Sequence, residues 1–224
     1  MSKKLLAILF LSTTTTSGIF ASSHNMHMLE VDLSAYEDAA AAVLKKIETM
    51  DLTWCSSVPL AEINSKSTYT NSSFNGELID IELKNETKQF AVVRYADLSI
   101  KAVSELDHEM NMNGLMLSWY PSGEFLGCAE LVDEKHEGAS IAKFPNGQIK
   151  AYAEFSGGEQ SGAELRFDTA GKLARYSNFK HGKQDGWGFF WSPSGKLVGV
   201  TEINQGQLIT ELYSEKPAIF EEMH

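Results

Sequence analysis

Between residues 114 and 212, apolar and polar residues alternate in short runs, and each run ends at a turn signal. An apolar residue at every second position is typical of a strand with one buried face. The turn signals include YPSG, FPNG, DTAG and SPSG. Proline presets φ at the second position of such a turn, and glycine accepts positive φ at the fourth. The pattern therefore predicts strands joined by tight turns.

The hairpin pattern repeats every 24 residues. The repeated columns are Gly114, Gly138, Gly162 and Gly186; Gly123, Gly147, Gly171 and Gly195; Phe125, Ile149, Leu173 and Leu197; and Leu131, Phe155, Phe179 and Ile203. Columns that share one period without insertion indicate a repeat array. We expect a mainly β fold in which a repeat array of β-hairpins forms one extended antiparallel meander sheet.

The array extends upstream in a less regular form. The segment YADLSIKAVSEL at Tyr95 matches YPSGEFLGCAEL at Tyr120, and FNGELIDIEL at Phe74 resembles FPNGQIKAYAEF at Phe144. We therefore expect five or six hairpins in all. Residues 52–113 are predicted to be a degenerate β-hairpin region, residues 114–212 four regular repeats, and residues 213–224 a C-terminal tail.

An amphipathic helix is predicted before the sheet, within residues 33–51. Ser34 can cap it, with Glu37 three residues later to complete a capping box. The following residues are rich in alanine, and apolar residues recur at helical spacing up to Met50. The open ends and faces of repeat arrays need caps, so we expect a capping helix; docking of a partner is the alternative role.

The N-terminus has the layout of a secretory signal in residues 1–21, where two lysines precede a short apolar run. This run is too short to span a bilayer. We expect an exported protein, periplasmic or secreted, with residues 22–32 as a flexible leader. Exported chains meet oxidising conditions, so Cys55 and Cys128 are either joined in a disulfide or are two buried free thiols; both alternatives stay open.

Composition narrows the classes of partner. The formal net charge is −11, and lysines and arginines form no cluster. Nucleic acids and anionic membrane surfaces need a basic footprint, so neither is expected to bind. No second apolar run is long enough for membrane insertion after signal removal. The sequence has no Gly-x-Ser-x-Gly elbow and no phosphate loop, so we predict a non-enzymatic protein without a cofactor.

Two features of the repeats are candidates for a binding surface. Glu130, Glu154 and Glu202 share one register and are predicted to point away from the apolar face. An aromatic cluster occupies the last regular repeat; its candidate binding residues are Trp187, Phe190 and Trp191. We expect these aromatic residues to be core or to pack under the C-terminal tail, and to form a binding patch if they are uncovered.

In the second strand of each repeat, the two ends of one face are apolar. The middle of this face holds a small residue in most repeats, at Gly127, Ala151 and Gly199, whereas Arg175 breaks this rule.

A metal site is an alternative at the mature N-terminus. Cleavage after Ala21 would leave Ser22 with a free amine, and His24 with an imidazole at the third position, donors that suit Cu(II) or Ni(II). His27 lies between two methionines, which suit Cu(I). The acidic turns LDHEMNMN and VDEKHEG at residues 106–113 and 132–138 lack a recognised metal-ligand spacing, and we expect them to be solvated.

The repeats, of the form G-x4-aromatic-x-x-G-x-L followed by E-aromatic-x-x-G, resemble the bacterial MORN-repeat variant. They are similar to the YwqK-type antitoxin-component family. The resemblance covers Gly114 to Leu212 and, loosely, Phe74 to Asn113. It implies an extended hairpin sheet used for protein contacts, and the family label implies neutralisation of a toxin inside a cell.

These observations lead us to expect an exported repeat protein that acts as a protein-binding or scaffold module through its hairpin sheet. Its partner would be a protein or a cell-envelope component. The alternatives are copper or nickel binding at Ser22, Ser23 and His24, an antitoxin-like role, and a secreted enzyme with a site in residues 52–73.

Overall fold

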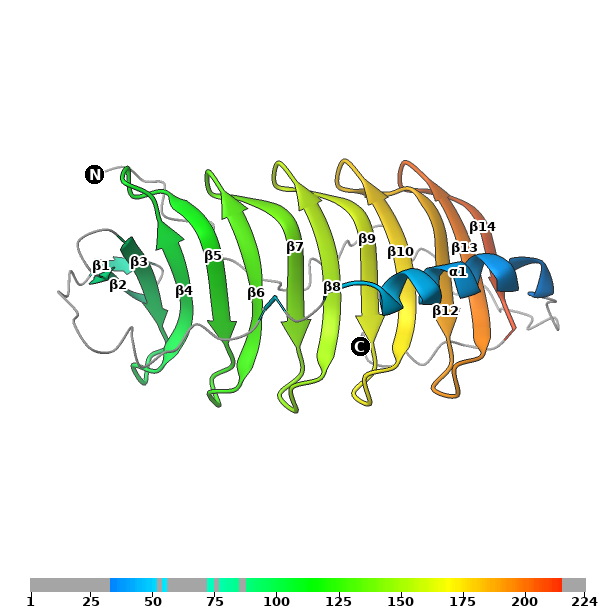
Figure 1. Cartoon of the computed structure of the whole chain (residues 1–224), viewed down its shortest axis with the longest axis horizontal. Helices are drawn as coiled ribbons and strands as arrows, with labels where there is room; N and C mark the ends of the chain where they lie inside the picture. The colour runs from blue at the N-terminus through cyan, green and yellow to red at the C-terminus, as the bar shows by residue number, and fades with distance from the viewer. Residues whose placement is uncertain (1–32, 52–53, 56–71, 75–76, 85–87, 215–224) are drawn as a thin grey trace.

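The computed structural model describes residues 33–51, 54–55, 72–74, 77–84 and 88–214. In this part of the chain a 14-stranded antiparallel sheet runs as a meander, with strands side by side in chain order (Figure 1). Only β11 lies off this path, and it pairs with β10. A short helical segment precedes the sheet. The predicted fold class is therefore confirmed.

The bounds of the elements follow the predicted repeats. The elements are η1 (Ser34–Tyr36), α1 (Glu37–Glu48), β1 (Ser72–Phe74), β2 (Glu77–Lys84), β3 (Lys88–Arg94), β4 (Ile100–Leu106), β5 (Met112–Trp119), β6 (Phe125–Val132), β7 (Lys135–Lys143), β8 (Ile149–Ser156), β9 (Glu159–Phe167), β10 (Leu173–Lys180), β11 (Lys183–Gln184), β12 (Gly186–Trp191), β13 (Leu197–Asn204) and β14 (Gln207–Tyr213).

The predicted four-residue turns lie at one edge of the sheet. In each turn the glycine N–H donates to the carbonyl of the first turn residue at 2.8–2.9 Å. The glycines have φ between 80° and 94°, a conformation that costs glycine little. The turn series is Tyr120–Gly123, Phe144–Gly147, Asp168–Gly171 and Ser192–Gly195.

Two-residue turns lie at the opposite edge, and each has positive φ at both residues. This geometry matches the twist of the flanking strands. The N–H of the second turn residue donates to a carbonyl of the preceding hairpin at 2.9 Å. The donor–acceptor pairs are Glu134 with Met112, Gly158 with His136, Gly182 with Gln160, and Gly206 with Gln184. A ladder of backbone hydrogen bonds thus links successive hairpins.

A β-bulge recurs in the second strand of every repeat. Pairing skips one residue at Leu126, Lys150, Ala174 and Val198, which are 24 residues apart. The same skip occurs upstream at Lys101, 25 residues before Leu126. The extra upstream residue lies in the turn after β4, where Asp107 Oδ1 accepts the N–H groups of Glu109 and Asn111, both at 2.9 Å. The glycine columns fade upstream because Leu98 and Met110 occupy the positive-φ turn positions there, with φ 71° and 68°.

One row of apolar residues crosses the sheet with one residue per strand. Its members pair directly across neighbouring strands: Val92, Val103, Leu117, Cys128, Ile141, Tyr152, Leu165, Tyr176, Phe189, Val200 and Leu212. Most of these side chains are buried. We call the side of the sheet that bears this row the covered face.

The segment η1–α1 lies across the covered face near the β14 end of the sheet (Figure 1). Leu33 and Ala40 are buried in a cluster with Phe189, Trp191 and Val200. Further along the chain, Ile47, Met50 and Trp54 pack against the core around Cys128. The N-terminal segment therefore covers a face of the array and runs from β13 back toward β6.

The start of the helix differs from the predicted capping box. The α-helix begins at Glu37, and Ser34 lies in the preceding 3-10 turn. The residue at the N-cap position is Tyr36, whose side chain makes no capping hydrogen bond. Leu33 and Ala40 pack on the sheet at this end of the helix.

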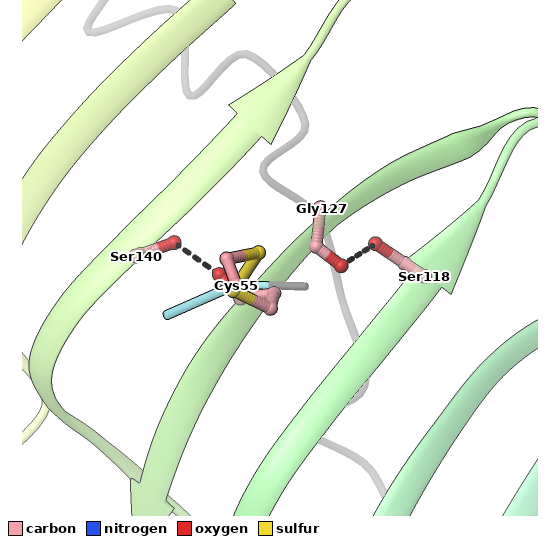
Figure 2. Close-up of a disulfide and its surroundings, with 5 residues drawn as sticks. Cys55, Ser118, Gly127 and Ser140 are labelled. Atoms are coloured by element: carbon pink, nitrogen blue, oxygen red, sulfur yellow. Dashed lines mark hydrogen bonds between the residues drawn. A yellow bond between two sulfur atoms is a disulfide. The ribbon is translucent and has the colours of Figure 1, made fainter. Parts of the chain in front are cut away.

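The segment ends at a disulfide between Cys55 and Cys128 of β6, with the Cα atoms 5.8 Å apart (Figure 2). Of the two alternatives left open for these cysteines, the structure contains the disulfide. Both residues are buried. On β6 and its neighbours, Ser118 and Ser140 donate to the carbonyls of Gly127 and Cys128 (Figure 2).

Replacement of Glu134 by glycine should stabilise the fold. Glu134 has φ 65°, whereas the other turns have glycine at this position. A non-glycine residue in this region costs about 1 kcal/mol, so we expect Glu134→Gly to raise the free energy of unfolding by about that amount. Urea denaturation followed by tryptophan fluorescence measures this.

The matched control is Gly182→Ala. A Cβ at Gly182 meets nothing within 4 Å, and its φ is 73°. The substitution therefore adds only backbone strain, and it should lower stability by about 1 kcal/mol. Equal stability of both variants and the parent would contradict the role assigned to these turns.

Loss of the disulfide should destabilise the chain strongly. The bond closes a loop over a sequence separation of 73 residues, and loop-closure entropy predicts about 4 kcal/mol for this length. We expect the double variant Cys55→Ser, Cys128→Ser to lose up to that amount in urea denaturation. Adding a reductant should lower the urea midpoint of the parent protein and leave that of the double variant unchanged. An unchanged midpoint for the double variant would rule out a stabilising bond.

Candidate functional site

The glutamate column is a structural feature of the covered face, contrary to the prediction that it points away from the apolar side. Glu154 Oε1 accepts the hydroxyl of Tyr152 at 3.0 Å, and Tyr152 belongs to the core. Glu130 pairs directly with Leu115, which packs against the same core. The bulge at Lys150 is the physical reason, because it shifts the alternation by one residue within the strand.

The carboxylates of this column lie against the glycine column of the next strand. Glu154 Oε2 accepts the N–H of Ala163 at 2.7 Å, and a side chain at Gly162 would collide with this carboxylate. Asn178, in the same column, donates from Nδ2 to the carbonyl of Asp185 at 2.9 Å. The side chains of this column thus satisfy backbone groups at the start of the following hairpin, so the column is a poor candidate for partner recognition.

The aromatic cluster is mostly core, which was the first expectation for it, so Trp191 and Phe190 do not form an uncovered binding patch. Trp191 is buried under α1, and Phe190 is buried on the other side of the sheet, 5.5 Å from the ring of Tyr213. Trp187 is 37% exposed, and its ring lies 5.3 Å from that of Tyr36. The N-terminal segment, which sequence reasoning did not place here, covers this cluster.

The histidines and acidic turns show no assembled metal site among the described residues, where no three potential ligands lie together. His136 packs against Phe155 with ring centroids 5.0 Å apart. Burial lowers the pKa of His136, so the ring is neutral at pH 7. Glu137 accepts the N–H of Gly157 at 2.7 Å. The proposed N-terminal ligands Ser22, His24 and His27 lie outside the described residues.

The side of the sheet opposite α1, which we call the opposite face, carries mostly small residues over β3 to β8, and most of them are buried. Two paired rows cross these strands. They consist of Ala91, Ser104, Met116, Ala129, Ser140 and Ala153, and of Val93, Ala102, Ser118, Gly127, Ala142 and Ala151. Where the same rows reach β9 and β10, the small residues give way to charged ones.

The charged residues form one cluster, which we call the arginine patch: Glu164, Arg166, Arg175, Ser177 and Gln184. Arg166 and Arg175 pair directly across β9 and β10, as do Glu164 and Ser177. Glu164 is only 7% exposed, and its Oε1 accepts Nε and Nη2 of Arg166 at 3.2 and 2.7 Å. A nearly buried carboxylate is therefore neutralised by one of the two arginines.

Arg175 is held by neutral partners. Its Nε donates to Ser177 Oγ at 2.9 Å, and its Nη2 donates to Gln184 Oε1 at 3.4 Å. The guanidinium lies 5.5 Å from the ring centroid of Phe190. Within the described part of the chain, no carboxylate forms an ion pair with Arg175. Burial lowers the pKa of Arg175, while the charge of Glu164 opposes this shift.

This patch is the best candidate site, because charged groups placed in a sheet face cost free energy unless they are paired. Sequence reasoning noted that Arg175 departs from a column of small residues but did not select it. The missing information was the register of β9 and β10, which places Arg166 opposite Arg175.

Comparison with known proteins adds no family assignment. No protein-family model matches the chain, and no curated protein matches it significantly. The resemblance to the MORN-repeat variant accordingly rests on the repeat pattern alone. Among the described residues, no helix is both long enough and apolar enough to cross a membrane.

Replacement of Glu154 by alanine should lower the stability of the isolated protein, with no binding partner present. The change removes the acceptor of Ala163 N–H and of the Tyr152 hydroxyl, and hydrogen bonds to a charged group contribute about 1.5–3 kcal/mol. We expect a loss of about 2 kcal/mol in urea denaturation. Glu159→Ala is the control, because Glu159 is exposed and its contact with His181 is 3.8 Å. Equal effects of both substitutions would contradict a structural role.

Proposed function

We propose that this chain is an exported, non-enzymatic repeat protein that binds a protein or a cell-envelope component through the opposite face of its sheet. The observation that carries the proposal is the arginine patch, in which the largely buried guanidinium of Arg175 has no carboxylate partner among the described residues and lies beside the partly exposed Arg166. Such a group is costly for folding alone, and an anionic group from a partner would compensate it.

The division of the two faces favours the opposite face for binding. The N-terminal segment covers the core row over β10 to β14 and is anchored to β6 by the disulfide. A partner would have to displace α1 to reach the aromatic residues beneath it. On the opposite face, the small residues over β3 to β8 are mostly buried, whereas the side chain of Arg166 is 40% exposed and can be reached directly.

Export is supported by two features together. Residues 1–21 have the layout of a secretory signal, and a disulfide is stable in the oxidising compartments that exported proteins reach. N-terminal sequencing of the protein from its host tests this part: a chain that starts after residue 21 supports export, and an intact N-terminus in the cytoplasm contradicts it.

Site-specific crosslinking tests the binding face. A photoreactive residue at position 211 should capture a partner in the cell envelope, because Glu211 is exposed and lies on the opposite face, one residue before Leu212 of the covered row. The matched control is position 44 on α1, where Leu44 is 37% exposed. We expect a discrete crosslinked band from position 211 and none from position 44, read by immunoblotting.

Two outcomes would contradict the proposal. A band from position 44 alone would assign docking to the helix. No band from either position, with both proteins folded and exported, would remove the support for a binding face.

A further inference from the structure

We propose that the arginine patch binds a single carboxylate group presented by the partner protein, with Arg175 as the main ligand and Arg166 beside it. This inference rests on the proposed function and names the chemistry of the partner. The carboxylate can belong to an acidic side chain or to a chain terminus, since both offer the same two oxygens to a guanidinium.

The geometry of Arg175 suits this role. Hydrogen bonds to Ser177 and Gln184 hold Nε and Nη2, and the ring of Phe190 lies near the guanidinium. These contacts restrict the side chain without neutralising its charge. A preorganised guanidinium loses little entropy when it binds, and its planar fork matches a carboxylate.

The charge of the patch indicates a monoanion. Arg166 and Arg175 supply two positive charges, and Glu164 supplies one negative charge, so the patch carries a net charge of about +1. A carboxylate neutralises this charge. A dianionic phosphate would leave an excess negative charge close to Glu164, which is nearly buried and therefore weakly screened.

A second observation extends the site toward β13. Thr201 is 4% exposed, and its hydroxyl has no hydrogen-bond partner among the described residues. A side chain at Gly188 would collide with this hydroxyl and would approach Gln184 Nε2 at 3.4 Å. The absent side chain at Gly188 thus leaves room for the Thr201 hydroxyl and for Gln184, whose Oε1 accepts a hydrogen bond from Arg175. A buried hydroxyl without a partner is a group that an oxyanion would satisfy.

Titration with short peptides tests the inference on the full-length mature protein. The Nε–H resonance of Arg175 is followed by two-dimensional NMR, with acetyl-Ala-Ala-Glu-Ala-amide as the side-chain probe and acetyl-Ala-Ala-Ala with a free C-terminus as the terminal probe. We expect a saturable shift with at least one of them. The Gln analogue of the first peptide should bind at least tenfold more weakly.

Variants assign the binding to Arg175. Arg175→Gln should reduce the affinity at least tenfold, and Arg175→Lys should give an intermediate loss because it keeps the charge without the planar fork. Lys180→Gln on the same strand is the control, because Lys180 is exposed and removes the same charge. Circular dichroism and thermal melting verify folding. If Arg175→Gln does not fold, Arg166→Gln is used in its place.

Three results would overturn the carboxylate assignment. They are equal shifts with the Glu and Gln peptides, no saturable shift with either acidic probe, and tighter binding of inorganic phosphate than of both peptides. Each of these is separable from the proposed function, because crosslinking from position 211 leaves both arginines in place and does not depend on the charge of the partner. A crosslinked partner combined with any of these results would refute only this inference.

Discussion

Each two-residue turn donates a backbone hydrogen bond to the hairpin before it, and the register of the array depends on this contact. A slip of one residue between neighbouring strands would break it and would move every side chain to the other face. The four-residue turns at the opposite edge then fix the second end of each strand. Turn type and bulge position are therefore the same in each regular repeat, and a 24-residue period is the result.

The fold could be predicted because these backbone requirements select particular residues. Turns with positive φ require glycine or tolerate a few polar residues, so Gly147 and Gly182 mark the two edges directly in the sequence. The face of each side chain was harder to predict. The bulge at Lys150 places Ile149 and Tyr152 on the same covered face although they are three residues apart. Simple alternation therefore assigned the glutamate column to the wrong side.

The candidate site was only partly visible from sequence, because it depends on contacts between distant segments. Arg175 could be recognised as an exception in a column of small residues, whereas its pairing with Arg166 comes from the register of two strands. The burial of Trp191 depends on the N-terminal segment, which packs on it from more than a hundred residues away in the chain. Helical periodicity predicted the helix and carried no information about the strands that it covers.

The position of the N-terminal segment also restricts how this array can change its length. The segment is anchored at β12 and β13 through Leu33 and Ala40, and at β6 through Cys55. One more hairpin between these points would separate the anchors by two further strand spacings, about 10 Å, and a helix with a fixed rise per residue cannot stretch to match. A hairpin added after β14 would leave both anchors in place. The segment thus fixes the number of strands between its two anchors. Duplication or loss of repeats is therefore tolerated at the β14 end and selected against between β6 and β12.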